Sequence, residues 1–319
     1  MIDWPLERDL ARAHEAAQRT RERIARFVRH TPLLELSGHP RRALKLETLQ
    51  HTGSFKVRGA AAAITAAPRP RQIVAASTGN HGLAVAAVAH ALELPCRVFV
   101  PAGAAPAKLA RLRAGAAELI ECDGDPLAAE LAAREAATQT PGALLVAPYN
   151  DAEVILGQAT LGLELFDDLD QPPDTLFVAV GGGGLIGGIA LAVRERWPRT
   201  RIIGALPEAS PAMADAVAAG RVTVSPLAPT LADATAGNLE QGSITVALAA
   251  ALVERFELIA EEEIAAAMRV ALLEHHLAIE GAAALALAAS LRDRDDDGER
   301  HLVVLGGGNV GAETLRTIL

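Results

Sequence analysis

The stretch Thr175-Leu-Phe-Val-Ala-Val-Gly-Gly-Gly-Gly-Leu-Ile-Gly-Gly-Ile-Ala-Leu-Ala-Val193 carries no charged residue over 19 positions, and six of those positions are glycine. Its length alone would allow a membrane span. The four consecutive glycines, Gly181 to Gly184, disfavour a continuous helix, because glycine loses the most backbone entropy on ordering. We therefore interpret the stretch as a buried strand, a glycine turn and a buried helix, and we expect no membrane association.

The same alternation of strand and helix continues on both sides of this stretch. Short apolar runs bounded by turn residues predict strands at residues 33–36, 43–47, 72–76, 97–100, 118–121, 176–180, 201–205 and 301–305. Amphipathic or alanine-rich segments predict helices at residues 4–28, 80–92, 106–114, 126–138, 151–168, 184–196 and 261–276. This pattern is typical of an α/β protein whose mostly parallel sheets have helices on both faces.

Two proline-rich joints, at residues 68–70 and 141–148, bracket a block with strand and helix units of its own. We expect two domains from this arrangement. The large one would comprise residues 1–67 and 148–319, and the small one residues 68–147.

Composition excludes several functional classes. The chain has 319 residues, half of them apolar, with a formal net charge of −9, which predicts a globular protein with a large core. The acidic balance and an aromatic content of 3% argue against nucleic-acid binding. Cys96 and Cys122 form no metal-binding or disulfide pattern, and the N-terminus shows no signal peptide. We therefore expect a cytoplasmic protein.

Two glycine clusters, at residues 181–187 and 306–311, each follow a predicted strand. Both match the dinucleotide-binding pattern GxGxxG, but the firmer inference is that free N–H groups at a helix start can form a cup for an anion such as phosphate. Close packing of helix on strand explains such glycines equally well. A nicotinamide-dependent dehydrogenase stays open, with a nucleotide site at Gly182, Gly184, Gly187 and Glu208.

Lysine is rare in this chain, with only Lys45, Lys56 and Lys108 among 30 basic residues. Lys56 lies at a predicted helix start between Phe55 and Val57. The positive end of the helix dipole and the apolar neighbours both favour the neutral amine, which is a nucleophile for aldehydes and a base for protons. A lysine that merely extends toward solvent would show the same pattern.

The segment Ala76-Ser-Thr-Gly-Asn-His-Gly82 also joins a predicted strand to a predicted helix. Its hydroxyls, amide and free N–H groups suit a carboxylate ligand, and an ordinary helix cap is the alternative.

Together these segments resemble the serine/threonine dehydratase family of pyridoxal-phosphate enzymes of fold type II, which also contains serine racemase. The likeness covers nearly the whole chain. It rests on Thr31-Pro-Leu-Leu, Lys45-Leu-Glu, Thr52-Gly-Ser-Phe-Lys-Val-Arg-Gly-Ala60, Ser77-Thr-Gly-Asn-His81, Gly157-Gln-Ala-Thr160, Gly181-Gly-Gly-Gly-Leu-Ile186, Ile279-Glu-Gly-Ala282 and Val304-Leu-Gly-Gly-Gly-Asn309. It implies two domains, each an open, mostly parallel twisted sheet flanked by helices, as in the tryptophan synthase β-like fold.

The resemblance also implies roles for individual residues. Lys56 would hold pyridoxal 5'-phosphate as a Schiff base and, once released by substrate, remove the α-proton. Phe55 would stack near the ring, and Asn80 would hydrogen-bond the ring hydroxyl. The residues around the phosphate and the ring nitrogen would be Gly181, Gly182, Gly183, Gly184, Leu185 and Gly306. The loop that grips the substrate carboxylate would be Ser77, Thr78, Gly79, Asn80 and His81.

The chain departs from the family at three places. Gly306 stands where a serine or cysteine usually meets the pyridine nitrogen. Thr78 stands where serine racemase has its serine base, which favours dehydration over racemisation. Leu206 and Ala212 stand where metal-binding members carry carboxylates, so we expect no metal ion.

The expected function is therefore a dehydratase (ammonia-lyase) that converts a β-hydroxy-α-amino acid, by default L-threonine or L-serine, to a 2-oxo acid and ammonia. Serine racemase is the alternative, as is a dehydratase of 3-hydroxyaspartate, phenylserine or a hydroxyectoine-derived substrate. Gly306 also leaves a non-catalytic amino-acid-binding protein open. We expect a homodimer, and no regulatory domain after the last glycine cluster.

Overall fold

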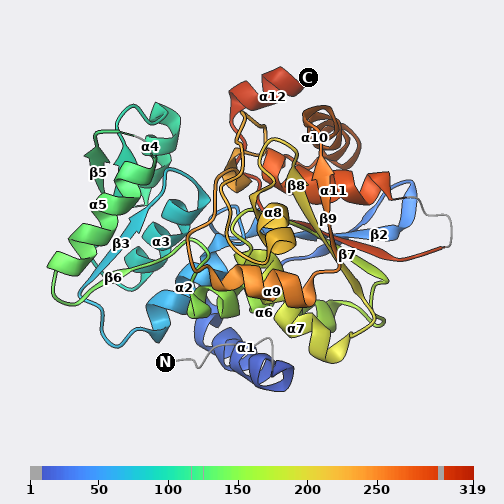
Figure 1. The fold of residues 1–319 in the computed structure, drawn as a ribbon, viewed down its shortest axis with the longest axis horizontal. Helices are drawn as coiled ribbons and strands as arrows, with labels where there is room; N and C mark the ends of the chain where they lie inside the picture. Colours follow the sequence, from blue (N-terminus) through green and yellow to red (C-terminus); the bar gives the residue numbers. More distant parts are fainter. Residues whose placement is uncertain (1–8, 116, 125, 294–297) are drawn as a thin grey trace.

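The computed structural model describes residues 9–115, 117–124, 126–293 and 298–319. Two sheets lie side by side, each between layers of helices (Figure 1). This is the α/β architecture that the alternation of strands and helices predicts.

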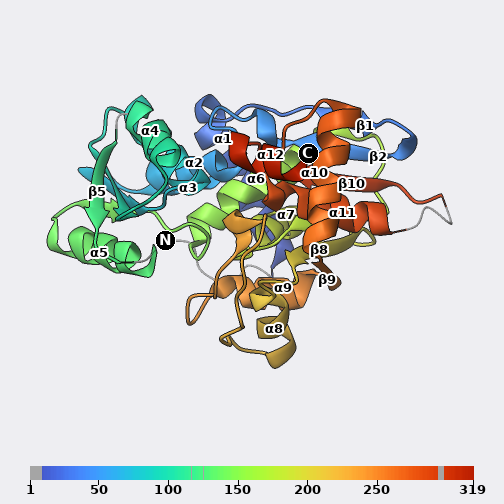
Figure 2. The same cartoon turned by 90° about the horizontal axis from the view of Figure 1, so that it is seen from above.

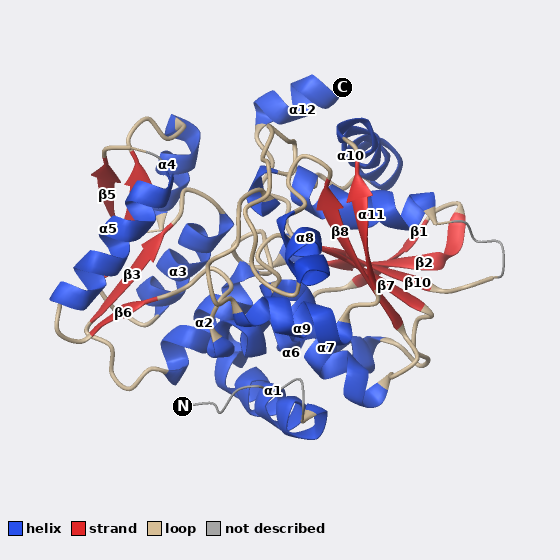
Figure 3. Ribbon diagram, viewed as in Figure 1, coloured by secondary structure: helices blue, strands red, loops and turns tan. Residues whose placement is uncertain are grey.

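The larger sheet has six strands in the order β1-β2-β10-β7-β8-β9, parallel throughout except for the antiparallel pair β1 and β2. Figure 3 shows these strands fanning between two layers of helices. The strands are β1 (Leu33–Leu36), β2 (His39–Leu46), β7 (Thr175–Ala179), β8 (Arg201–Pro207), β9 (Arg255–Ile259) and β10 (His301–Leu305).

Helices cover both faces of the larger sheet, and alternate side chains of each strand face opposite layers. In β7, Leu176 and Val178 pack on one side and Phe177 on the other. The first side carries α1 (Leu10–Ile24), α6 (Ala152–Asp168), α7 (Gly184–Arg196), α8 (Ala212–Ala219) and α9 (Ile244–Leu252). The second carries α10 (Glu261–His275), α11 (Gly281–Arg292) and α12 (Ala312–Ile318). Seen from above, α8 and α9 lie together at the margin of their layer (Figure 2).

The smaller sheet is parallel throughout, in the order β5-β4-β3-β6. Its strands are β3 (Gln72–Ala76), β4 (Cys96–Pro101), β5 (Glu118–Cys122) and β6 (Ala143–Leu145). On one face α3 (Asn80–Ala91) and α4 (Pro106–Ala114) pack on Ile73 and Ala75, and on the other α5 (Pro126–Gln139) packs on Val74.

Helix α2 (Lys56–Ala66) joins the two halves, because it packs against both α3 and α6. The approach to α6 is close: a Cβ on Gly157 would lie 2.5 Å from the carbonyl oxygen of Arg58. The small residues Ala60 to Ala63 are buried along the same helix. The fold therefore holds Lys56, the first residue of α2, at the seam between the two sheets.

The structure corrects the predicted opening helix. Residues 4–8 of the predicted segment 4–28 lie outside the described residues, and α1 begins at Leu10, where the Asp9 side chain accepts a hydrogen bond of 3.0 Å from the Arg12 backbone N–H. The helix ends at Ile24 and gives way to a 3₁₀ turn, Ala25–Phe27. Among the helices described, none is long and apolar enough to cross a membrane.

Candidate active site

The predicted site segments lie at the carboxyl ends of parallel strands, where α/β sheets bind ligands. Residues 181–183 follow β7, residues 306–308 follow β10, and residues 77–79 follow β3. The helix α7 begins directly after the first of these loops, and α3 begins directly after the third.

The amine of Lys56 points toward the segment that leaves the smaller sheet. Its Nζ donates a hydrogen bond of 2.8 Å to the carbonyl oxygen of Pro148, and it lies 5.2 Å from the centre of the Phe55 ring. Burial lowers the pKa of Lys56 to about 8, although the charge of Glu280 partly opposes the shift. A sizeable fraction of this amine is therefore neutral near physiological pH.

Tyr149 connects the lysine to the glycine loop. It follows Pro148 in the chain, and a Cβ on Gly182 would lie 2.3 Å from the Tyr149 ring. The Tyr149 hydroxyl accepts a hydrogen bond of 2.8 Å from the backbone N–H of Glu240, which fixes the ring. The consecutive residues Pro148 and Tyr149 thus contact the lysine amine and the glycine loop, respectively.

The glycine loop itself requires glycine. Gly183 has φ of +81°, and a Cβ there would lie 2.6 Å from Met213. The Thr245 hydroxyl donates a hydrogen bond of 2.7 Å to the Gly182 carbonyl oxygen. The first N–H groups of α7 have no acceptor within the helix, so the loop can bind an anion.

Gly306 lies against two other predicted site residues. Its carbonyl oxygen accepts a hydrogen bond of 3.0 Å from the Phe55 backbone N–H. A Cβ on Gly306 would lie 3.2 Å from Phe55 Cδ1 and 3.8 Å from Leu185 Cδ2. Phe55, Leu185 and Gly306 therefore lie together.

Asn80 is hydrogen-bonded at both ends of its amide. Its Nδ2 lies 2.9 Å from each carboxylate oxygen of Glu280, and its Oδ1 accepts 2.7 Å from Nδ2 of Asn309. Burial raises the pKa of Glu280, and the nearby Asp233 raises it further. The site therefore contains a carboxylate within electrostatic reach of Lys56.

The loop before α3 can offer backbone groups to a ligand, whereas the ring of His81 points away into the interior. The Ser77 hydroxyl accepts 3.1 Å from the Gly79 N–H, and Thr78 is partly exposed. The His81 ring is buried, with Nε2 2.9 Å from the carbonyl oxygen of Val146. Burial, helped by Lys56, lowers the pKa of His81 to about 3, so the ring is neutral and Nε2 is the donor.

Comparison with known protein families identifies the family of this chain. The family described as pyridoxal-phosphate dependent enzyme matches residues 24–307. The chain belongs to this family.

Individual relatives of this pyridoxal-phosphate enzyme support the same family. The chain is 38% identical over 313 residues to the L-threonine ammonia-lyase of Geobacter sulfurreducens, and the match covers 95% of this chain and 77% of that protein. It is 34% identical over 273 residues to the catabolic L-threonine dehydratase of Escherichia coli, covering 84% and 82%. The solved structure of maize serine racemase superposes with a TM-score of 0.88 at 29% identity, covering 95% of each chain. The fold is type II, as the motifs predict.

The residues present suit pyridoxal phosphate. An amine with a pKa of about 8 can react with an aldehyde, and the N–H groups at the start of α7 can bind a phosphate. Phe55 offers an aromatic face 5.2 Å from the same amine. These features lie within one region of the enzyme.

Four residues of the site have no role predicted from the sequence: Pro148, Tyr149, Glu280 and Asn309. Glu280 and Asn309 lie inside motifs that the resemblance used, so a search for polar residues in those motifs would have found them. Pro148 and Tyr149 have no local signal, because their role depends on packing against residues far away in the chain.

A buried network of ion pairs surrounds Arg58 of α2, near the junction of the two sheets. Arg58 donates 2.7 Å to Glu47 and 2.7 Å to Glu164, and Lys45 lies 2.9 Å from Glu164 and 2.7 Å from Asp168. The network joins α2 to β2 and α6. It fixes the helix that carries Lys56.

Three exposed or partly exposed contacts join helices of the smaller sheet to loops of the larger one. They are Lys108 with Asp233 at 3.0 Å, Arg134 with Glu240 at 2.8 Å, and Arg111 with Asn309. We call these the bridging contacts.

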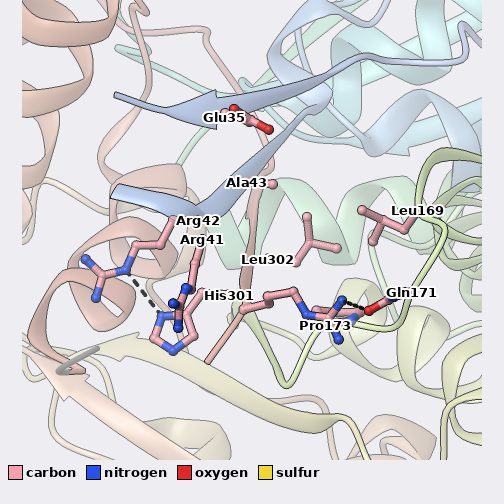
Figure 4. Close-up of a pocket in the computed structure, with 10 residues that line it drawn as sticks. Glu35, Arg41, Arg42, Ala43, Leu169, Gln171, Pro173, His301 and Leu302 are labelled. Carbon is pink, nitrogen blue, oxygen red and sulfur yellow. Dashed lines mark hydrogen bonds between the residues drawn. The ribbon is translucent and has the colours of Figure 1, made fainter. Parts of the chain in front are cut away.

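A separate pocket of about 120 Å³ lies at the opposite end of β10, where His301 begins the strand (Figure 4). Arg41, Arg42 and Arg300 line it together with the apolar side chains of Leu169 and Leu302. It shares no residue with the site at the carboxyl ends.

The positions matched to metal ligands have no ligating atoms. Leu206 and Ala212 are buried apolar residues, and Glu208 is exposed. Within the described ranges, no group of three or more histidine, cysteine, aspartate or glutamate side chains could hold a metal ion. The absence of a structural metal stays a prediction.

Proposed function

We propose that this enzyme is an ammonia-lyase that converts a β-hydroxy-α-amino acid, L-threonine or L-serine, to a 2-oxo acid and ammonia. The observation that carries the proposal is the Lys56 amine, with its pKa of about 8, held 2.8 Å from the Pro148 carbonyl oxygen beside the glycine loop. The printed functions of the Geobacter and Escherichia relatives support the same reaction.

Lys56 serves two purposes in this proposal. Its neutral amine would hold the cofactor covalently, and its Nζ, once displaced by the substrate amine, would accept the α-proton of the substrate. The Pro148 carbonyl oxygen accepts a hydrogen bond from one N–H of the amine, so the nitrogen lone pair points in another direction. When bound, pyridoxal phosphate supplies the electron sink that stabilises negative charge at the α-carbon.

The other site residues bind and orient the cofactor and the substrate. The N–H groups of Gly181, Gly182, Gly183, Gly184 and Leu185 hold the phosphate, Phe55 and Gly306 flank the ring, and Asn80 donates to the ring hydroxyl. The loop Ser77, Thr78, Gly79, Asn80 and His81 binds the substrate carboxylate. His81 contributes to this loop through its backbone, because its Nε2 is bonded to Val146.

Racemisation is the second candidate, because the structure matches maize serine racemase with a TM-score of 0.88. It requires a base on the opposite face of the substrate, and Thr78 is the hydroxyl in the position that the resemblance assigns to it. A threonine hydroxyl without an adjacent base is a weak proton acceptor, which favours elimination.

We further propose the domain division, the oligomeric state and the cellular location. The large domain would be residues 1–67 and 148–319 and the small domain residues 68–147. All strands of the smaller sheet fall between Gln72 and Leu145, which supports this division. The family resemblance is the basis for proposing a homodimer in the cytoplasm.

One experiment tests the function. The purified protein, loaded with pyridoxal phosphate, is assayed for ammonia and 2-oxo acid with L-threonine, L-serine, 3-hydroxyaspartate and phenylserine, and for D-serine formed from L-serine. We expect 2-oxo acid from threonine or serine at a rate far above that of D-serine formation. Faster formation of D-serine would favour the racemase, and colourless protein that takes up NAD instead would contradict the proposal.

A further inference from the structure

The backbone and the side chain of Glu280 are both closely constrained by neighbouring residues. Glu280 is the residue before α11, where its backbone carbonyl oxygen accepts from Ala283 and Ala284, and its backbone N–H donates 3.1 Å to Gly307. A Cβ on Gly307 would lie 2.4 Å from Glu280 Oε1, so the chain after β10 can pass there only as glycine. Both ends of Glu280 are thus fixed by the fold.

This carboxylate determines which way the Asn80 amide faces. The two ends of an asparagine amide have nearly the same shape, so hydrogen-bond partners decide its orientation. Glu280 offers two acceptor oxygens at 2.9 Å and therefore selects the NH₂ end. Asn309 offers a donor at 2.7 Å and therefore selects the oxygen end.

Asn309 is itself held in place. Its Nδ2 also donates 2.9 Å to the carbonyl oxygen of Thr52, and its Oδ1 accepts from Arg111. Its backbone N–H reaches the Glu280 carboxylate. Asn80, Glu280 and Asn309 therefore form a closed set in which each member restrains the other two.

An amide held in this way has one donor left for a further partner. An NH₂ group carries two hydrogens, and Glu280 takes one of them. The second hydrogen lies on the same end of the amide, so the orientation that Glu280 selects keeps a donor, and not an acceptor, available to the cofactor.

We propose that Glu280 is a positioning residue of the active site, which acts by holding the Asn80 amide with its NH₂ group as the donor to the ring oxygen of pyridoxal phosphate. The inference rests on the role proposed above for Asn80. Glu280 makes no contact with substrate in this account. Its hydrogen bonds reach the cofactor only through Asn80, and its charge acts separately on the pKa of Lys56, so affinities are compared above pH 8, where the amine is mostly neutral.

Opposing influences act on the pKa of Glu280, and the net shift, caused mainly by burial, is upward. Lys56 attracts the carboxylate and lowers its pKa, as do the N–H groups of Asn80 and Asn309. Burial and the neighbouring Asp233 raise the same pKa. Lys108 offsets the charge of Asp233 at 3.0 Å.

A double-mutant cycle tests this dependence, with the apoenzyme variants Glu280→Gln, Asn80→Ala and the double variant. Two quantities are measured for each: the dissociation constant for pyridoxal phosphate and the position of the visible absorption band of the bound cofactor. Glutamine has the size of glutamate but is neutral and offers one acceptor and one donor, so it holds the Asn80 NH₂ group less firmly than the carboxylate does, although the Asn309 donor remains. Losing one charge-assisted hydrogen bond predicts about tenfold weaker binding, together with a shifted band.

The proposal requires that Glu280→Gln have less than about a twofold effect in the Asn80→Ala background. Effects that multiply in the double variant would overturn it, and so would wild-type affinity and an unshifted band in Glu280→Gln. Glu262→Gln, at an exposed position of α10, is the matched control and should leave both readouts unchanged. Should Glu280→Gln fail to fold, Glu280→Asp takes its place in the same cycle with the same criterion, because the shorter side chain cannot reach the Asn80 amide from the same backbone position.

Both readouts are independent of turnover. Wild-type protein that binds the cofactor but releases no 2-oxo acid would overturn the proposed function, while the cycle would still decide the role of Glu280.

Discussion

The Nζ of Lys56 donates a hydrogen bond of 2.8 Å to the carbonyl oxygen of Pro148, 92 positions away in the chain. Pro148 precedes the tyrosine whose ring packs against Gly182. The amine that reacts with an aldehyde and the loop suited to a phosphate are therefore set relative to each other by two consecutive residues.

Replacing Lys56 by alanine removes the amine needed for the covalent link. We expect Lys56→Ala to lose the visible absorption band and 2-oxo acid release, because no other amine lies at this position. Lys108→Ala is the matched control, since this exposed lysine pairs with Asp233 on the other half of the molecule, and it should retain the band. Turnover at the wild-type rate in Lys56→Ala would remove the residue from the mechanism.

The rate at which pyridoxal phosphate attaches to the apoenzyme should depend on pH through Lys56. Its pKa is lowered to about 8, so the neutral fraction, and with it the rate constant, rises about tenfold per pH unit below pH 8 and levels off above it. Because the charge of Glu280 raises this pKa, Glu280→Gln should move the inflection to lower pH. Stopped-flow absorbance measures both curves, and an inflection near the ordinary lysine value would contradict the prediction.

A negative charge in the glycine loop should repel the phosphate. We expect Gly183→Asp to weaken cofactor binding by at least about tenfold, as measured by absorbance titration. Gly183→Asn has nearly the same shape without the charge and separates repulsion from the strain at φ of +81°. Gly38→Asp places the same residue at φ of +78° in open space and should leave binding unchanged. Equal affinities of the Asp and Asn variants would place the phosphate elsewhere.

Chelation should leave activity intact. Leu206 and Ala212 provide no oxygen or nitrogen ligand at the positions matched to the metal-binding members, so the fold has no reason to depend on a divalent ion there. Initial rates before and after dialysis against EDTA check this. A large loss that added magnesium or calcium restores would show the interpretation of these two positions to be wrong.

Removing the buried guanidinium of Arg58 should destabilise the fold strongly. Arg58→Met leaves Glu47 and Glu164 without their main partner in the interior, and such a loss costs about 3–5 kcal/mol. Arg21→Met, which breaks an exposed pair with Asp167, should cost less than about 1 kcal/mol. Urea unfolding of both apoenzymes gives the comparison, and equal losses would contradict the buried network.

Local sequence patterns predicted the elements around the site well. Strands β3 and β10 and helices α4 and α7 have the predicted bounds, because glycine and proline residues lie at or near their ends. Helix α11 was not predicted: its residues Gly281 to Ser290 are buried on all sides, so no apolar face repeats along the sequence. The edge strand β9 was missed as well, since it mixes charged and apolar residues.

The site could be predicted only where its chemistry lies in short motifs. Lys56, the glycine loop and the Asn80 loop each follow a strand or open a helix, and the structure brings them together. The contacts of Tyr149 with Gly182 and of Glu280 with Asn80 join residues about 30 and 200 positions apart, and no local pattern encodes them. The inward orientation of the His81 ring also depends on a distant carbonyl, that of Val146.

The bridging contacts should respond to dissolved salt. The ion pairs Lys108 with Asp233 and Arg134 with Glu240 are exposed enough for counter-ions to reach them, so their attraction weakens as the Debye length shortens. The Arg58 network is buried and is screened much less. We therefore expect ionic strength to weaken contacts between the two halves of the molecule while it leaves the support of the Lys56 helix largely unchanged.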